Sequence, residues 1–428
     1  MRNKYTYPIN TSIFINKLLF FSEKYTYFSL LTSSEKNHDK YSNFHTIAAF
    51  ESVEVLKSVE NSFENLLDFH TKHKDWLFGY LSYDLKNELE DLTSRNLDFQ
   101  NFAHLEFFVP ETIFFIKDNC LVVESFLPKE EMEYLIEKIN NTKVINKKKS
   151  LISMQFRESK EEYIDKINKI KSHIQLGDIY EINYCQELYS DGLSIDPSLT
   201  FFNLHNKSDA PFSVFSKFNE NYLLCSSPER YLKKINDKII SQPIKGTRKR
   251  GLTSYEDNEL KEQLRLSQKD RSENIMITDL VRSDLSKTSK RSSVIVEELC
   301  EIYSFERVHQ MISTISSKLD INFNFVDVLK TTFPMGSMTG APKLKSMELI
   351  EKFETTKRSL FSGSFGYITP DFDFDFNVVI RSILYNALNR NISVMVGGAI
   401  TINSNPDDEY EESLIKAKAM IEVLEGEK

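Results

Sequence analysis

Apolar side chains recur with a helical period in three segments of the second half of the chain. Between residues 161 and 175 they lie three or four positions apart, and Gly177 follows as a stop signal. Residues 255–280 and 407–425 carry the same period. The pattern therefore predicts helices over these three segments.

Short runs rich in β-branched and aromatic residues predict strands around these helices. They cover residues 77–83, 106–109, 112–117, 121–126, 222–226, 238–240, 294–296, 364–368, 377–384 and 392–396. Because strands and helices do not alternate strictly, we expect an α+β fold with helices flanking sheets, and not a Rossmann fold. The polar, basic segment 141–150 (NTKVINKKKS) is the best linker candidate, which predicts an N-terminal region, 1–145, and a C-terminal catalytic region, 155–428.

Composition narrows the class of protein. The 428 residues carry a formal net charge of −9, which argues against a nucleic-acid partner. The four cysteines show no CxxC spacing, so we expect neither a zinc site nor disulfides. No apolar run approaches the roughly 18–20 residues of a membrane span, and no signal peptide is evident. We therefore expect a cytoplasmic protein that does not bind membranes.

Two pairs of carboxylates stand at helical spacing. Asp270 precedes Glu273 by three residues, and Glu409 precedes Glu412 by three, with Lys416 four further on. Each pair shares one face of its helix. Two such faces could hold Mg²⁺, which takes one or two protein carboxylates and leaves room for substrate oxygens. The alternative is that both faces are solvated and carry ordinary ion pairs.

Glycines and one lysine mark a candidate ligand cleft. Residues 334–343 (PMGSMTGAPK) precede a helical stretch whose first N–H groups would bind an anion, and Gly397 and Gly398 end a strand that a ligand could approach. Lys245 stands between a strand and Gly246 in SQPIKGT (241–247). If this lysine is buried, its pKa should fall and its amine become a nucleophile. The alternatives are tight turns for the glycines and a surface position for the lysine.

Ten segments occur in an order that resembles the chorismate-utilising enzymes. They are GDIYEINYCQE (177–187), SSPERY (226–231), PIKGT (243–247), KDRSENIMITDLVRSDL (269–285), VHQMIST (308–314), FPMGSMTGAPKLKSMELIE (333–351), SGSFGY (362–367), VVIRS (378–382), VGGAIT (396–401) and EYEES (409–413). This family comprises the large subunits of anthranilate and aminodeoxychorismate synthases, together with isochorismate and salicylate synthases. The resemblance implies two intertwined subdomains whose sheets pack face to face, with helices outside and the active site in the cleft between them.

The resemblance also implies a role for each matching residue. The matches are Glu273 and Glu412 for Mg²⁺, with Asp270 and Glu409 acting through water; Tyr367 and Arg381 for a substrate carboxylate; Thr339, Gly397, Gly398 and Lys416 for the rest of the chorismate pocket; and Glu229 for acid/base chemistry.

Two positions indicate which reaction the resemblance implies. Aminodeoxychorismate synthases carry PIKGT, as this chain does at Lys245, where anthranilate synthases carry PIAGT. Isochorismate synthases carry a water-activating lysine where this chain has Glu181. The resemblance thus implies that Lys245 attacks C2 of chorismate while the C4 hydroxyl leaves. Ammonia would then add at C4 to give 4-amino-4-deoxychorismate, the precursor of 4-aminobenzoate and folate.

Other readings of the family resemblance stay open. The family's usual histidine aligns with Gln310, beside His309, and a family glycine is Ala399. The alternatives are therefore component I of anthranilate synthase and a non-catalytic family member. The sequence shows no nucleophile-elbow cysteine of a glutaminase, so we expect ammonia from solution or from a separate glutamine amidotransferase subunit.

Overall fold

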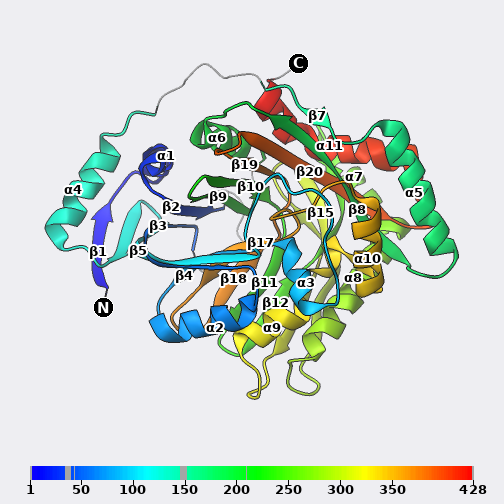
Figure 1. Ribbon diagram of the computed structural model, residues 1–428, viewed down its shortest axis with the longest axis horizontal. Coiled ribbons are helices and arrows are strands. Elements are labelled where there is room, and N and C mark those ends of the chain that lie inside the picture. The colour runs from blue at the N-terminus through cyan, green and yellow to red at the C-terminus, as the bar shows by residue number, and fades with distance from the viewer. Residues whose placement is uncertain (1, 34–39, 43, 145–151, 209, 427–428) are drawn as a thin grey trace.

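The strands form one continuous antiparallel sheet, and its two halves, called the first and the second sheet below, lie face to face at the centre of the protein with helices on their outer sides (Figure 1). The computed structural model describes residues 2–33, 40–42, 44–144, 152–208 and 210–426. Residues 145–150 of the predicted linker therefore lie outside the described residues.

The first sheet gathers strands from both ends of the chain. In spatial order these are β1 (Asn3–Pro8), β6 (Cys120–Ser125), β5 (Leu105–Lys117), β3 (Thr46–Ser58), β2 (Tyr27–Thr32), β9 (Phe212–Phe218), β10 (Asn221–Ser227), β19 (Ser382–Asn386), β20 (Asn391–Ile400) and β8 (Glu181–Asp191), with the short β7 (Gln155–Phe156) and β16 (Gly340–Ala341) paired to β8.

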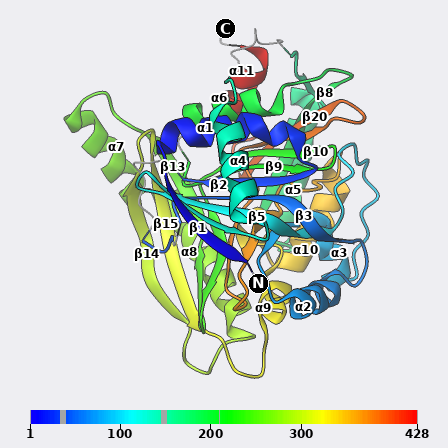
Figure 2. The same cartoon turned by 90° about the vertical axis from the view of Figure 1, so that its left-hand side faces the viewer.

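The second sheet continues from the first half of β5. Its strands are β4 (Leu77–Leu81), β17 (Ser364–Ile368), β18 (Phe374–Asn377), β11 (Arg230–Ile235), β12 (Lys238–Gln242) and β15 (Val308–Lys318), with β13 (Ile244–Lys249) beside β12 on one side of β15 and β14 (Ile295–Ser304) on the other. Figure 2 shows β13, β14 and β15 at the outer edge of the molecule, with α7 beyond them. Because β2 pairs with β9 and β4 with β17, the region 1–145 builds both sheets jointly with the C-terminal region.

Helices form the outer layers. Over the first sheet lie α1 (Thr11–Phe21), α4 (Lys129–Asn140), α6 (Pro197–Ser208) and α11 (Pro406–Glu425), and beside β8 lie α5 (Lys160–Gln175) and α10 (Lys343–Phe353). The other helices are α2 (Ser62–His73), α3 (Lys86–Leu89), α7 (Ser254–Leu266), α8 (Gln268–Ser286) and α9 (Phe325–Thr332), with single 3₁₀ turns η1 (Ser22–Lys24), η2 (Tyr83–Leu85) and η3 (Gly336–Met338).

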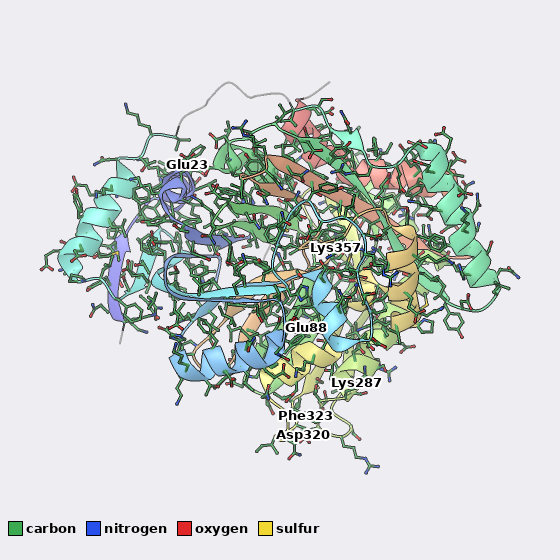
Figure 3. The ribbon with its side chains drawn as sticks, in the orientation of Figure 1. Glu23, Glu88, Lys287, Asp320, Phe323 and Lys357 are labelled. Atoms are coloured by element: carbon green, nitrogen blue, oxygen red, sulfur yellow. The ribbon has the colours of Figure 1, made fainter. Side chains whose placement is uncertain are left out.

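Alternation along the strands divides the core into two main parts. On β2, Phe28 and Leu30 belong to the cluster under the helices of the first sheet, whereas Tyr27 belongs to the cluster between the sheets. Figure 3 shows side chains filling both layers, while the labelled Asp320 and Phe323 mark the turn between β15 and α9 at the lower edge. The predicted α+β fold with sheets packed face to face is confirmed.

Most predicted elements are confirmed, and three are wrong in detail. Segments 106–109 and 112–117, predicted as two strands, form the single strand β5. Segment 255–280 is two helices, because Ser267 adopts an extended conformation and caps α8, its hydroxyl accepting from the Asp270 N–H. Segment 377–384 is not one strand, because residues 378–381 separate β18 from β19 and Arg381 has a φ of 52°. This break lies beside the candidate site and sets the direction of the Arg381 side chain.

Candidate active site

A cavity of about 510 Å³ lies between β13 and β15 of the second sheet, β20 of the first sheet, and helices α8 and α11. Its lining contains all but two of the predicted site residues: Glu229, Lys245, Asp270, Glu273, Arg381, Gly397, Gly398, Glu409, Glu412 and Lys416. The structure therefore brings these ten residues into one concave site, as a substrate pocket requires.

Tyr367 lies elsewhere. It is buried on β17, where its ring packs 5.6 Å from the ring of Trp76 and 6.0 Å from that of Phe78, and it lines a separate cavity of about 60 Å³. The prediction that Tyr367 joins Arg381 at a substrate carboxylate is wrong for this structure. The reason is that β17 pairs with β4 inside the second sheet and directs this ring into the aromatic core between the sheets.

Thr339 also does not line the cavity. Its side chain is fully buried, and its hydroxyl donates to the Met335 carbonyl at 3.2 Å. Its own carbonyl accepts from the N–H of Asn183, which does line the cavity. Thr339 therefore supports the wall of the site instead of presenting a group to a ligand.

Lys245 is buried and paired. Its Nζ donates to Glu181 Oε1 at 2.9 Å, and the two side chains are 10% and 1% exposed. Burial lowers the pKa of Lys245, but the carboxylates of Glu181, Glu273 and Glu229 outweigh it, so the pKa is raised. The prediction of a buried lysine is confirmed, while the predicted fall in its pKa is wrong, because it took no account of these carboxylates.

Glu229 is a buried carboxyl group with a raised pKa. It lies between β10 and β11, and its side chain is almost completely buried. Burial raises its pKa to about 7, against the opposing effects of Ser337 and Lys245. A carboxyl group with such a pKa can remain protonated near neutrality and act as a general acid.

Four carboxylates from two helices face the cavity. Asp270 and Glu273 come from the first turns of α8, and Glu409 and Glu412 from α11. Burial, opposed by Lys245 and reinforced by Glu181, raises the pKa of Glu273 to about 7. A raised pKa means that the charged form of Glu273 is unfavourable in this structure, as is expected for a buried carboxylate that binds a cation.

Two features of this cluster fit a divalent cation. Oε1 of Glu273 is buried without a hydrogen-bond partner among the described residues. A Cβ atom at Gly398 would lie 3.4 Å from Glu409 Oε2, 3.4 Å from Lys416 Nζ and 3.9 Å from Glu412 Oε1, so the glycine leaves open the space that these three groups surround. Within the described ranges, no three Asp, Glu, His or Cys side chains are grouped closely enough to enclose an ion. An ion held here would therefore need waters or substrate oxygens to complete its shell, as Mg²⁺ commonly does.

Two lysines neutralise the carboxylates of α11. Lys269 Nζ lies 3.1 Å from Glu409 Oε1, and Lys416 Nζ lies 2.7 Å from Glu412 Oε1. Burial disfavours the charge of Glu412, but Lys416 outweighs it and lowers the pKa of Glu412. Lys416 also donates to the Gly397 carbonyl at 2.9 Å, which ties α11 to β20.

Arg381 presents a buried guanidinium. Its Nη1 donates to the Lys416 carbonyl at 2.9 Å, and burial lowers its pKa to about 10, which leaves it charged at neutral pH. The guanidinium forms no ion pair with a carboxylate among the residues that the structure describes. Its planar donors suit a substrate carboxylate.

Sequence reasoning missed several polar groups of the site. Glu181 served only to distinguish the reactions of the family, and no role in the site was predicted for it. No role was predicted for Lys269, Asn183 or Ser337 either. The strand alternation that points Glu181 and Asn183 to one side of β8 was a readable signal. The partners of these residues come from distant segments, so their contacts could not be read from the chain.

Comparison with known proteins agrees with this arrangement. The chorismate binding enzyme family model matches residues 21–422. The chain belongs to this family. It is 34% identical over 385 residues to the chloroplastic aminodeoxychorismate synthase of Arabidopsis thaliana, and 30% identical over 405 residues to aminodeoxychorismate synthase component 1 of Bacillus subtilis. It is also 30% identical over 400 residues to anthranilate synthase component 1 of Aquifex aeolicus.

Coverage differs among these chorismate binding enzymes. The alignments cover 82%, 88% and 88% of this chain, but 41% of the plant protein against 83% and 80% of the two bacterial proteins. The chain thus spans less than half of the plant relative. The crystal structure of anthranilate synthase component I from Streptococcus pneumoniae superposes with a TM-score of 0.78 at 22% identity, covering 90% of this chain and 95% of that one. No helix among the described residues is long and apolar enough to cross a membrane.

Proposed function

We propose that the chain is component 1 of an aminodeoxychorismate synthase, which converts chorismate and ammonia to 4-amino-4-deoxychorismate. The observation that carries the proposal is Lys245, whose buried amine lines the cavity of a chorismate binding enzyme. Similarity to the component 1 of Bacillus subtilis over 83% of that protein supports it. We further propose that a separate glutamine amidotransferase subunit supplies the ammonia.

Each step of the reaction has a group of this chain to perform it. Arg381 binds a substrate carboxylate through its guanidinium, and Lys245, once deprotonated, attacks ring C2. Glu229 holds the proton that the C4 hydroxyl takes as it leaves. Ammonia then adds at C4, the bond from C2 to Lys245 Nζ breaks, and amination falls at the para position.

A divalent cation completes the proposed site. Glu273 and Glu412 would hold Mg²⁺, with Asp270 and Glu409 reached through water. The bound ion would offset the charge of the ring carboxylate as electrons move toward it. The unpartnered oxygen of Glu273 and the space at Gly398 support this assignment.

A product assay tests the proposed function. The wild-type protein, given chorismate, Mg²⁺ and ammonium, should form a product that an added aminodeoxychorismate lyase converts to 4-aminobenzoate. Lys245→Ala should abolish it, whereas Lys129→Ala, at a side chain 64% exposed on α4, should behave as wild type. Fluorescent anthranilate as the product would contradict the proposal and favour the anthranilate synthase reaction. Binding of chorismate without turnover would indicate a non-catalytic family member.

A further inference from the structure

Glu181 is the one side chain to which Lys245 Nζ donates a hydrogen bond among the described residues, at 2.9 Å. The pair joins the two sheets, because Glu181 is the first residue of β8 and Lys245 lies on β13. The backbone of Glu181 is fixed on both sides: it pairs with Ala341 of β16, and its carbonyl accepts from Ser346 Oγ at 3.2 Å. These contacts fix the position of the Glu181 carboxylate beside the Lys245 amine. Glu181 itself is not among the residues that line the cavity.

The amine of Lys245 must lose a proton before it can attack carbon, because an ammonium has no lone pair. The charged groups that act on it are Glu181 from β8, Glu229 from the β10–β11 turn, Glu273 from α8 and Glu412 from α11. In the proposed reaction Glu229 donates its proton to the leaving hydroxyl, and Glu273 and Glu412 bind the cation. Among these four carboxylates, only Glu181 is hydrogen-bonded to Nζ in the structure.

We infer that Glu181 accepts the proton of Lys245 and aims its amine at the substrate, a role that rests on the function proposed above. Oε2 of Glu181 is buried without a hydrogen-bond partner among the described residues, so the ammonium is the main stabiliser of the carboxylate charge. Once substrate excludes water from the cavity, both buried charges lose hydration, which lowers the cost of moving one proton between them. Transfer of one proton over 2.9 Å removes both charges.

The step balances with the groups present. A proton moves from Nζ to Glu181, the Nζ lone pair forms the bond to C2, and the two ring double bonds shift as the C4–O bond breaks. The departing hydroxyl takes the proton of Glu229 and leaves as water. Ammonia then bonds to C4, the C2–Nζ bond breaks, Glu181 returns its proton to Lys245, and the new ammonium at C4 reprotonates Glu229.

The test measures how fast the covalent adduct between Lys245 and the substrate forms, and not the final product. Wild type and Glu181→Gln, each with chorismate and Mg²⁺ but no ammonium, are sampled by intact-protein mass spectrometry for an adduct on Lys245. Glutamine keeps the hydrogen-bond acceptor and the volume but cannot take a proton. We expect the adduct to form ~10²- to 10⁴-fold more slowly at pH 7. The deficit relative to wild type should shrink about tenfold per pH unit, because solvent hydroxide then removes the proton.

The matched control is Glu187→Gln on the same strand. Glu187 is buried and pairs with Arg157 at 2.8 Å away from the cavity, so its loss tests the effect of breaking a buried ion pair on β8. This variant should form the adduct at the wild-type rate. A wild-type rate in Glu181→Gln would overturn the inference. A slow rate with the pH dependence of wild type would also overturn it, because it would leave Glu181 a positioning role alone.

Failure of the inference and failure of the proposed function remain distinguishable. If wild type forms no 4-amino-4-deoxychorismate, the proposed function fails whatever Glu181 does. If Glu181→Gln does not fold, Glu181→Asp replaces it; its withdrawn carboxylate should slow adduct formation about tenfold while keeping the pH dependence of wild type. An unchanged rate in Glu181→Asp would then overturn the inference.

Discussion

His309 and Gln310 are neighbours on β15 whose side chains point to opposite faces of the sheet. Gln310 lines the cavity, and its Oε1 is buried without a hydrogen-bond partner among the described residues. His309 faces away, with Nε2 3.0 Å from Asp257 Oδ1 and Nδ1 2.8 Å from Ser304 Oγ. His309 therefore does not take the place of the family's histidine in this cavity, because adjacent residues of a strand alternate in direction.

This alternation predicts opposite effects for two alanine variants. His309→Ala should lower the free energy of unfolding by roughly 1–3 kcal/mol, because it removes a buried side chain and two of its hydrogen bonds, with kcat unchanged. Gln310→Ala should leave stability unchanged and lower kcat/KM for chorismate about tenfold, through loss of a polar group in the pocket. Urea unfolding and steady-state amination measure the two quantities. A loss of activity in His309→Ala with unchanged stability would contradict the assignment.

Glu229 should make stability depend on pH. Burial raises its pKa from 4.5 in the unfolded chain to about 7 in the folded protein, so the folded state holds this proton more tightly. Its contribution to stability is therefore fully present below pH 4.5 and is lost as pH rises through about 7. Glu229→Gln, which mimics the protonated form, should match wild type near pH 4 and exceed it at pH 8 by on the order of 3 kcal/mol.

Urea midpoints at the two pH values check this expectation. Glu262→Gln, at a side chain 52% exposed on α7, serves as the control and should change neither midpoint. If Glu229→Gln proves less stable than wild type at pH 8, the charged form of Glu229 does not destabilise the folded protein and the expectation is wrong.

The sequence predicted the elements better than it predicted the contacts between them. Helix α5 follows from its own period and stop signal, and the N-cap Ser267 with Asp270 three residues later was a readable sign that α7 and α8 are separate. The misplacement of Tyr367 has a different origin. Its partner Trp76 belongs to a segment nearly three hundred residues away and meets it only because β4 pairs with β17.

The electrostatics of the site were also beyond local reasoning. Burial alone lowers the pKa of a lysine, and the sequence gives no sign that Glu181 lies 2.9 Å from Lys245 Nζ. Similarly, Arg381 adopts a positive φ that its own side chain does not favour, so the break before β19 shows only in the folded protein.

Arg381→Lys should impair substrate binding more than its retained charge suggests. Lysine keeps a cation but loses the planar pair of donors that a carboxylate accepts, so KM for chorismate should rise about 10- to 100-fold. Steady-state kinetics measures this change. Arg265→Lys, at a side chain 59% exposed on α7, is the matched control. An unchanged KM in Arg381→Lys would show that the guanidinium does not hold a substrate carboxylate.

The carboxylates of α8 and α11 should determine cation affinity independently of turnover. Titration calorimetry with Mg²⁺ should give saturable binding to wild type, weakened by about tenfold or more in Glu273→Gln and in Glu412→Gln. Glu411→Gln, 60% exposed on the same helix as Glu412, should bind Mg²⁺ as wild type does. Lys269→Met should strengthen binding, because the Lys269 ammonium lies 3.1 Å from Glu409 and competes with the ion for its charge. Equal Mg²⁺ affinity in wild type and both carboxylate variants would show that the cation does not bind at this cluster. Lys269 would then be only a structural partner of Glu409.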